Sequence, residues 1–138
     1  MRDKYFISIA VEEKIEKLDK KYNAIGIDLG LKEFAITSNG EKITNPRVLK
    51  KYEKKIARLQ RSLARKEKGS SNWNKAKKKL AKVNEKVANI RKDFLHKLST
   101  KLICENQTIC LETLQVKNML KNQNLAKSIS DVSWSKFV

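Results

Sequence analysis

Two carboxylates stand in apolar runs where acidic side chains are uncommon. Asp28 lies inside "AIGIDL", between Gly26 and Gly30, and Glu112 follows the apolar run of "QTICLETL". An acid buried among apolar side chains costs several kcal/mol unless it is neutralised or coordinated. Carboxylate oxygens are the ligands that Mg²⁺ and Mn²⁺ prefer, and the two glycines leave room for an ion and a backbone. If the two acids approach each other, they predict a divalent-metal site able to hydrolyse a phosphodiester.

Each acid also has an ordinary explanation. A single Asp in a strand is usually an edge or turn residue, and a Glu at a strand end is usually solvated. The "GIDLG" stretch also opens the nucleotide site of sugar kinases and actin-like proteins. Those proteins follow it with Gly-rich or hydroxyl-rich residues, whereas this chain has Leu31-Lys32-Glu33-Phe34 and little room for a second domain. The nucleotide-binding alternative is therefore disfavoured.

The elements that must position these acids can be read from the pattern of apolar residues. Five segments are rich in β-formers and are expected to be strands: 4–12, 24–29, 33–38, 41–44 and 107–114. Asn39-Gly40 supplies the tight turn of a hairpin, so the second to fourth of these strands form a meander.

A long antiparallel helical hairpin is expected over residues 46–103. Asn45 is a candidate N-cap before Pro46, Gly69 is a candidate stop, and Ser71 or Asn72 caps the second helix. Apolar residues step by three and four through both helices: Leu49, Tyr52, Ile56, Leu59 and Leu63, then Trp73, Ala76, Leu80, Val83, Val87, Ile90 and Phe94. Two short helices follow residue 114, and the last of them carries apolar residues with nothing to pack on: Val132, Trp134, Phe137 and Val138.

This order of elements predicts an α/β fold of the ribonuclease-H-like type, a mixed sheet interrupted by the basic hairpin. In that fold the first and fourth strands lie side by side and parallel, which would bring Asp28 and Glu112 together. Residues 22–45 would supply the first three strands, and 104–138 the fourth strand with the helices after it.

The positive charge is concentrated in the hairpin. The chain has 32 Lys/Arg against 15 Asp/Glu, a net charge of +17. Residues 46–103 hold 20 Lys/Arg and 4 Asp/Glu, a balance of +16. The four acids are too few to neutralise this charge by ion pairing. We therefore expect contacts with nucleic-acid phosphates that depend strongly on salt. They are predicted for Arg58, Arg61, Arg65, Lys75, Lys78, Lys79, Lys82, Lys86 and Arg91. A solvated helix face is the alternative.

Other features favour structural roles. Trp73 is expected in the hairpin core rather than stacked on a base, and His96 is left out of the site. No run of about 18 apolar residues is present, and the N-terminus does not have the charge pattern of a secretory signal. Cys104 and Cys110 lack the spacing of a metal knuckle, so a reduced, cytoplasmic setting is expected, with Cys110 as a small core residue.

Three stretches of the chain carry a family resemblance: "AIGIDLGLKEFAITSNGEKI", "LARKEKGSSNWNKAKKKLAKVNEKVANIRKDFLHKLSTKL" and "ICLETLQVKNMLKNQNLAKSISDVSWSKF". Together they resemble the TnpB (OrfB) proteins of insertion-sequence transposons, which are similar to type V CRISPR effectors. The resemblance implies an RNA-guided DNA endonuclease with a RuvC-like nuclease domain, with DNA and guide RNA as partners. It implies that Asp28 and Glu112 are catalytic acids that bind Mg²⁺ or Mn²⁺, and that residues 1–13 end a preceding β-barrel domain.

The chain departs from the family pattern in two respects. The family's third catalytic acid and its zinc ribbon of paired CxxC motifs are not found in the sequence. Asp131 is the only acid after Glu112 and fits a helix cap better than a third ligand. We therefore expect weak metal binding and little cleavage by the isolated chain. The alternative is a non-catalytic nucleic-acid-binding module, which self-associates through exposed sheet edges.

Overall fold

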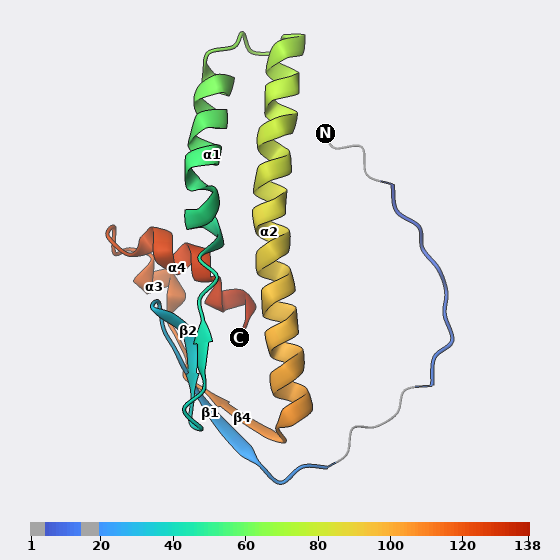
Figure 1. The fold of residues 1–138 in the computed structure, drawn as a ribbon, viewed down its shortest axis with the longest axis vertical. Helices are drawn as coiled ribbons and strands as arrows, with labels where there is room; N and C mark the ends of the chain where they lie inside the picture. Colours follow the sequence, from blue (N-terminus) through green and yellow to red (C-terminus); the bar gives the residue numbers. More distant parts are fainter. Residues whose placement is uncertain (1–4, 15–19) are drawn as a thin grey trace.

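The computed structural model describes residues 5–14 and 20–138, which form a mixed sheet, two long helices and a short helical C-terminal region (Figure 1). The elements follow in the order β1 (Ala24–Leu29), β2 (Glu33–Thr37), β3 (Lys42–Thr44), α1 (Val48–Ala64), α2 (Ser71–Glu105), β4 (Thr108–Leu111), α3 (Val116–Met119), α4 (Ala126–Val132) and the 3-10 turn η1 (Trp134–Lys136). The α/β class is confirmed, whereas the assignment to the ribonuclease-H-like type stays a prediction.

The sheet has four strands in the order β3-β2-β1-β4. β1 pairs antiparallel with β2 and parallel with β4, and β2 pairs antiparallel with β3. The predicted meander and the parallel pairing of its first strand with the fourth are confirmed. Gly40 closes the β2–β3 turn with φ of 83°, a conformation that glycine adopts without steric cost, and its N–H donates to the Thr37 carbonyl at 2.9 Å.

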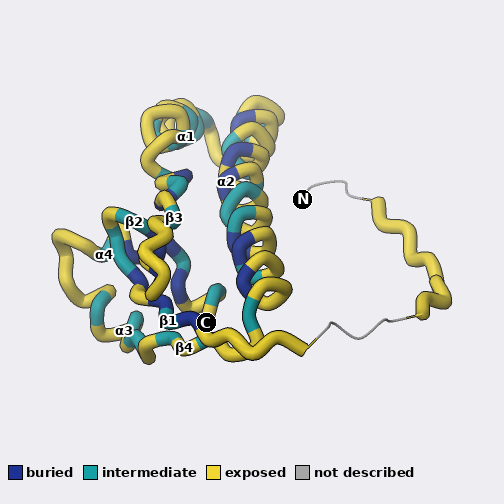
Figure 2. The backbone as a smooth tube through the Cα atoms, turned by 60° about the horizontal axis from the view of Figure 1, so that its bottom comes forward, coloured by how far each residue is buried: buried dark blue, intermediate teal, exposed yellow. Residues whose placement is uncertain are grey.

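One face of the sheet carries the core. Ile25, Ile27 and Leu29 alternate inward along β1, and Leu95, Leu98 and Leu102 of α2 belong to the same buried cluster (Figure 2). A helix laid along one sheet face buries the alternate residues of each strand and leaves the other face open. The opposite face of β1 is therefore available for a site.

The C-terminal region completes this core. Val132 and Trp134 are buried, and Phe137 packs edge-to-face on Phe34 with ring centroids 5.1 Å apart. The expectation that these apolar residues have nothing to pack on was wrong, because η1 folds back toward the sheet. Val138 remains exposed.

α2 is one continuous helix of 35 residues, roughly 50 Å long at 1.5 Å per residue. Its first half runs antiparallel to α1 and buries Ala76, Val83 and Val87, as the heptad pattern predicts (Figure 1). Its second half covers the sheet. The predicted hairpin of 46–103 therefore consists of α1 paired with the first half of α2, while the second half of α2 packs on the sheet.

Both predicted helix starts were displaced by a few residues. α1 begins at Val48. Asn45 is buried and stabilises the loop before the helix: its Nδ2 donates to the Leu31 carbonyl and its Oδ1 accepts from the Arg47 N–H, each at 3.0 Å. α2 is capped by Ser70, whose Oγ accepts from the Trp73 N–H at 3.1 Å. Gly69, the candidate stop of the first helix, does not end it, because α1 already ends at Ala64; Gly69 lies in the loop between the helices with φ of 91°.

The N-terminal segment does not form the strand expected over 4–12. Residues 5–14 have no strand partner in the described part of the chain, and Tyr5, Ile7 and Ile9 are largely exposed; residue 4 lies outside the described residues. A strand needs a neighbour for its backbone hydrogen bonds, so β-rich composition alone does not produce one. The assignment of this segment to a preceding β-barrel stays a prediction.

Among residues 5–14 and 20–138, no helix combines the length and the apolar character that a membrane span requires.

Candidate metal centre and nucleic-acid interface

The parallel pairing of β1 and β4 brings the two predicted acids together. The register runs from Ala24 opposite Thr108 to Ile27 opposite Leu111, and Asp28 and Glu112 are the next residue on each strand. Both side chains line one shallow hollow of about 370 Å³, together with residues of β1 and the β2 end that include Gly26 and Ser38. Two carboxylates therefore meet at one end of a rigid sheet.

The burial expected for Asp28 was wrong. Along β1 the inward positions are those of Ile25, Ile27 and Leu29, so Asp28 points to the open face and is exposed, as is Glu112. The acid therefore carries no penalty for burial. What favours a site is its position beside a second carboxylate on a surface that a large substrate can approach.

The two glycines beside Asp28 have different roles. A Cβ at Gly26 would lie 3.6 Å from Ser38 Cβ, an ordinary contact, whereas a Cβ at Gly30 would lie 3.0 Å from the Glu33 carbonyl oxygen. A side chain at Gly30 would therefore press on the tight β1–β2 turn. Gly26 pairs with Ser38, which accepts its N–H on Oγ at 3.1 Å and donates its own N–H to the Gly26 carbonyl at 2.8 Å.

The carboxylate pair fits a hydrated divalent ion. Mg²⁺ is commonly bound by one or two carboxylates while it keeps several waters, and the hollow is open enough for them. In the part of the chain that the structure describes, no cluster of three or more His, Cys, Asp or Glu side chains is formed. Two protein ligands predict weak binding.

Two lysines that the sequence did not single out lie next to the acids. Lys32 and Lys42 line a second hollow of about 260 Å³. Asp28 and Ile36 line both this hollow and the one that contains Glu112. The registers place Asp28 opposite Ile36 and Ile36 opposite Lys42, so Lys42 lies two strands from the acid. Only strand pairing reveals this, because 14 positions of sequence separate the two residues.

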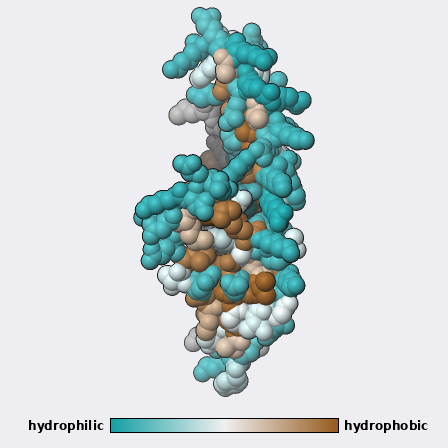
Figure 3. Space-filling view, turned by 90° about the vertical axis from the view of Figure 1, so that its left-hand side faces the viewer, coloured by the Kyte–Doolittle hydropathy of each residue, from teal (hydrophilic) through white to brown (hydrophobic). Residues whose placement is uncertain are grey.

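The hairpin presents its charge to solvent. Figure 3 shows mostly hydrophilic side chains over the upper part of the molecule, where the hairpin lies. Eight of the nine predicted contact residues are exposed: Arg58, Arg61, Arg65, Lys75, Lys78, Lys79, Lys82 and Lys86. Lys86 also lies 5.9 Å from the centre of the Tyr52 ring, and the Arg61 Nε–H donates to the Ala57 carbonyl at 3.3 Å.

Arg91 is the exception, because its guanidinium already binds a carboxylate; its role in phosphate binding stays a prediction. Its Nε and Nη2 donate to Asp131 Oδ1 at 3.0 and 2.7 Å, and the Arg91 and Asp131 side chains are only 22% and 10% exposed. Both Asp131 oxygens also accept the Leu49 N–H, at 2.9 and 3.0 Å. Asp131 is therefore a helix cap as predicted, although it caps α1 from α4.

Trp73 and Cys110 were expected to have structural roles. Trp73 is half-buried, with Lys77 Nζ 4.9 Å from its ring centre. Cys104 and Cys110 are free thiols and exposed, so the expectation of a core role for Cys110 was wrong. Cys110 shares the open face of the sheet with Gly26, its partner in the register.

Comparison with protein families identifies the family of the chain. The family model OrfB_IS605, described as "Probable transposase", matches residues 6–123. The chain belongs to the OrfB transposase family.

Curated OrfB relatives carry more specific names. The chain is 44% identical over 132 residues to a Streptomyces pristinaespiralis protein named "Putative RNA-guided DNA endonuclease", with 96% of this chain and 33% of the relative covered. It is 38% identical over 120 residues to InsQ of Escherichia coli K12, which bears the same description, with 86% of this chain and 30% of InsQ covered. The OrfB chain thus spans about a third of the length of these relatives.

Proposed function

We propose that this OrfB chain forms part of the nuclease domain of a transposon-encoded, RNA-guided DNA endonuclease. The observation that carries the proposal is the pair Asp28 and Glu112, on adjacent parallel strands beside one open hollow. The order of strands and helices supports a RuvC-like assignment for the sheet. The names of the relatives support DNA and a guide RNA as partners.

In this proposal the two carboxylates hold Mg²⁺ or Mn²⁺ through their oxygens. The bound ion supplies the Lewis-acid chemistry that activates water and stabilises the leaving oxygen of a phosphodiester. Exposure of Asp28 and Glu112 on the open face lets a DNA backbone reach them without a rearrangement of the sheet. Lys32 and Lys42 beside Asp28 attract the same backbone.

The basic hairpin supplies the binding energy in this proposal. Its exposed Arg and Lys side chains contact phosphates without reading the base sequence. In an RNA-guided nuclease the sequence is read by pairing of the guide RNA, so a protein surface of this kind is sufficient.

Divalent-metal binding tests the carboxylate pair. We expect calorimetric titration of the chain with Mn²⁺ to show weak, saturable binding, which Asp28→Ala and Glu112→Ala each abolish because one carboxylate alone cannot hold the ion. Asp93→Ala is the matched control, since Asp93 is an exposed acid on α2 away from the hollow. Unchanged Mn²⁺ binding in the Asp28→Ala/Glu112→Ala double variant would contradict the site.

Cleavage is a separate prediction. We expect the purified chain to cut DNA slowly or not at all in Mg²⁺, because its described residues bring only two acids together and a two-metal reaction needs more ligands. A gel assay on supercoiled plasmid measures this. Rapid Mg²⁺-dependent cutting that Asp28→Ala removes would show that two acids suffice.

The charge of the hairpin favours a second candidate function for the chain alone, a non-catalytic nucleic-acid-binding module. The hairpin segment carries a balance of +16 whatever the state of the metal site. Loss of Mn²⁺ binding with full retention of nucleic-acid binding would identify that case. Self-association through exposed strand edges stays a prediction.

A further inference from the structure

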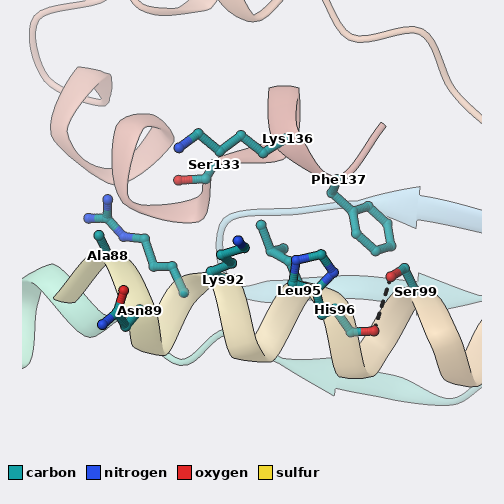
Figure 4. Close-up of a pocket in the computed structure, with 10 residues that line it drawn as sticks. Ala88, Asn89, Lys92, Leu95, His96, Ser99, Ser133, Lys136 and Phe137 are labelled. Atoms are coloured by element: carbon teal, nitrogen blue, oxygen red, sulfur yellow. Dashed lines mark hydrogen bonds between the residues drawn. The ribbon is translucent and has the colours of Figure 1, made fainter. Parts of the chain in front are cut away.

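A basic cavity lies at the foot of the hairpin, away from the carboxylate pair. Its volume is about 560 Å³, and it lies between α2 and the turn that leads into η1 (Figure 4). Lys92, Leu95 and His96 line it from α2, and Lys136 and Phe137 line it from the C-terminal side. None of its lining residues is among the predicted nucleic-acid contacts except Arg91, whose guanidinium is bound to Asp131.

The geometry of the backbone brings the two walls together. Lys92 and His96 are four residues apart, so they project from the same face of α2. Ser133 has φ of 60°, an uncommon conformation for a residue with a side chain, and it reverses the chain after α4. The reversal places Lys136 on the wall of the cavity opposite α2, and Figure 4 shows its side chain passing above Lys92 with the ammonium end directed away from His96.

The charges around the cavity lack compensation. Lys92 and Lys136 form no ion pair with any residue in the described ranges 5–14 and 20–138, and no Asp or Glu lines the cavity. Ser99 Oγ donates to the His96 carbonyl at 3.0 Å and Ser133 Oγ to the Ser130 carbonyl at 3.2 Å, so both hydroxyl protons are already used. Binding of an anion therefore falls to the two ammonium groups and the imidazole.

Apolar residues beside the two ammonium groups strengthen their attraction for an anion. Leu95 is buried and Phe137 is half-buried, so one side of the cavity is a low-dielectric surface where charge interactions are stronger than in water. The volume lies within the range of about 300–1,000 Å³ that is usual for small-molecule sites. It exceeds the needs of a single inorganic phosphate and accommodates a nucleotide unit.

We propose that this cavity binds a backbone phosphate of a nucleic-acid strand, held by Lys92, His96 and Lys136. The proposal rests on the proposed nucleic-acid function and adds a defined subsite to the diffuse contacts of the hairpin. The subsite lies where α2 passes from the hairpin to the sheet, so a strand bound along the hairpin extends into it.

The single histidine of the chain provides a local probe. We expect the imidazole Hε1 resonance of His96 to shift saturably when the full chain is titrated, at fixed pH and salt, with a short single-stranded oligothymidylate. Inorganic phosphate should cause a shift in the same direction with lower affinity, because it lacks the neighbouring phosphates that reach the hairpin lysines.

Two double variants separate the cavity from general charge screening. Lys92→Gln/Lys136→Gln should abolish the saturable shift and lower the salt slope of oligonucleotide binding by about 0.7, because one phosphate is no longer neutralised. Lys54→Gln/Lys55→Gln removes two exposed charges from α1, outside the cavity, and should keep the saturable shift. Circular dichroism of each variant verifies folding, which neither exposed pair is expected to affect.

Three results would overturn the proposal: a shift that grows linearly without saturation, an equal loss in both double variants, or binding of inorganic phosphate that the oligonucleotide does not displace. The last result would identify a site for free phosphate. Asp28→Ala should leave the His96 shift intact, so failure of the carboxylate site and failure of this subsite can be told apart.

Discussion

Replacement of Asp131 by alanine is expected to lower the free energy of unfolding by about 2–4 kcal/mol. The substitution removes the acceptor for the Leu49 N–H at the start of α1 and leaves the Arg91 guanidinium, which is 22% exposed, without its partner. Loss of a cap costs about 1 kcal/mol, and an ion pair shielded from water adds the rest. Urea unfolding followed by circular dichroism measures the change.

Variants of the same element separate the two contributions. Asp131→Asn keeps an oxygen for the Leu49 N–H but loses the charge that binds Arg91, so its effect should be intermediate. Asp93→Ala is the control, because Asp93 and its partner Lys97 are 62% and 76% exposed and such pairs contribute less than about 1 kcal/mol. An Asp131→Ala variant as stable as Asp93→Ala would show that the Asp131 contacts contribute little.

Asp131 also connects parts of the fold that have different roles. It belongs to α4, and it binds the first turn of α1 and the middle of α2 at the level where the hairpin meets the sheet. A second contact from α4 acts in the same way, since Lys127 donates to Glu53 of α1 and this hydrogen bond lowers the pKa of the Glu53 carboxyl. α4 thus fixes the direction of the basic hairpin relative to the candidate metal centre.

The positions of the two acids could be predicted from the sequence because they depend on topology. A first strand containing Asp28 and a later strand ending at Glu112, with a meander and helices between them, imply parallel neighbours in one sheet. The exposure of Asp28 could not be predicted in the same way. An apolar run such as "AIGIDL" is typical of a strand covered on both faces, but α2 covers only one, and Gly26 and Asp28 occupy the other.

Contacts between distant residues account for most of the other differences. Arg91 is indistinguishable from its basic neighbours along α2 until α4 brings Asp131 to it across 40 positions. Asn45 has the residue type of an N-cap, but its Oδ1 accepts the Arg47 N–H before the helix begins, and the first-turn N–H of Leu49 is bound by Asp131 instead. Local propensity names the candidates for such roles, and tertiary packing selects among them.

The hairpin gives the largest expected effect on binding. If six to ten of its cations contact phosphates, the affinity for duplex DNA should fall by about 10³–10⁵ between 50 and 200 mM salt, because each contact releases condensed counterions. Eight exposed residues of the predicted set are available for such contacts. Fluorescence anisotropy with a labelled duplex of arbitrary sequence, repeated at several salt concentrations, gives the slope of log affinity against log salt.

Two variants with equal loss of charge test whether the hairpin itself makes these contacts. Arg58→Gln/Arg61→Gln/Arg65→Gln removes three exposed cations from α1 and its end and should lower the slope by about 0.9 for each phosphate that is no longer neutralised. Lys14→Gln/Lys117→Gln/Lys121→Gln removes three exposed cations outside the hairpin and should change the slope little. Equal slopes for the two variants would mean that net charge, rather than the hairpin surface, attracts the nucleic acid. A clear difference between them would establish the hairpin as the surface on which the strand lies, since only direct neutralisation of phosphates changes the number of ions released.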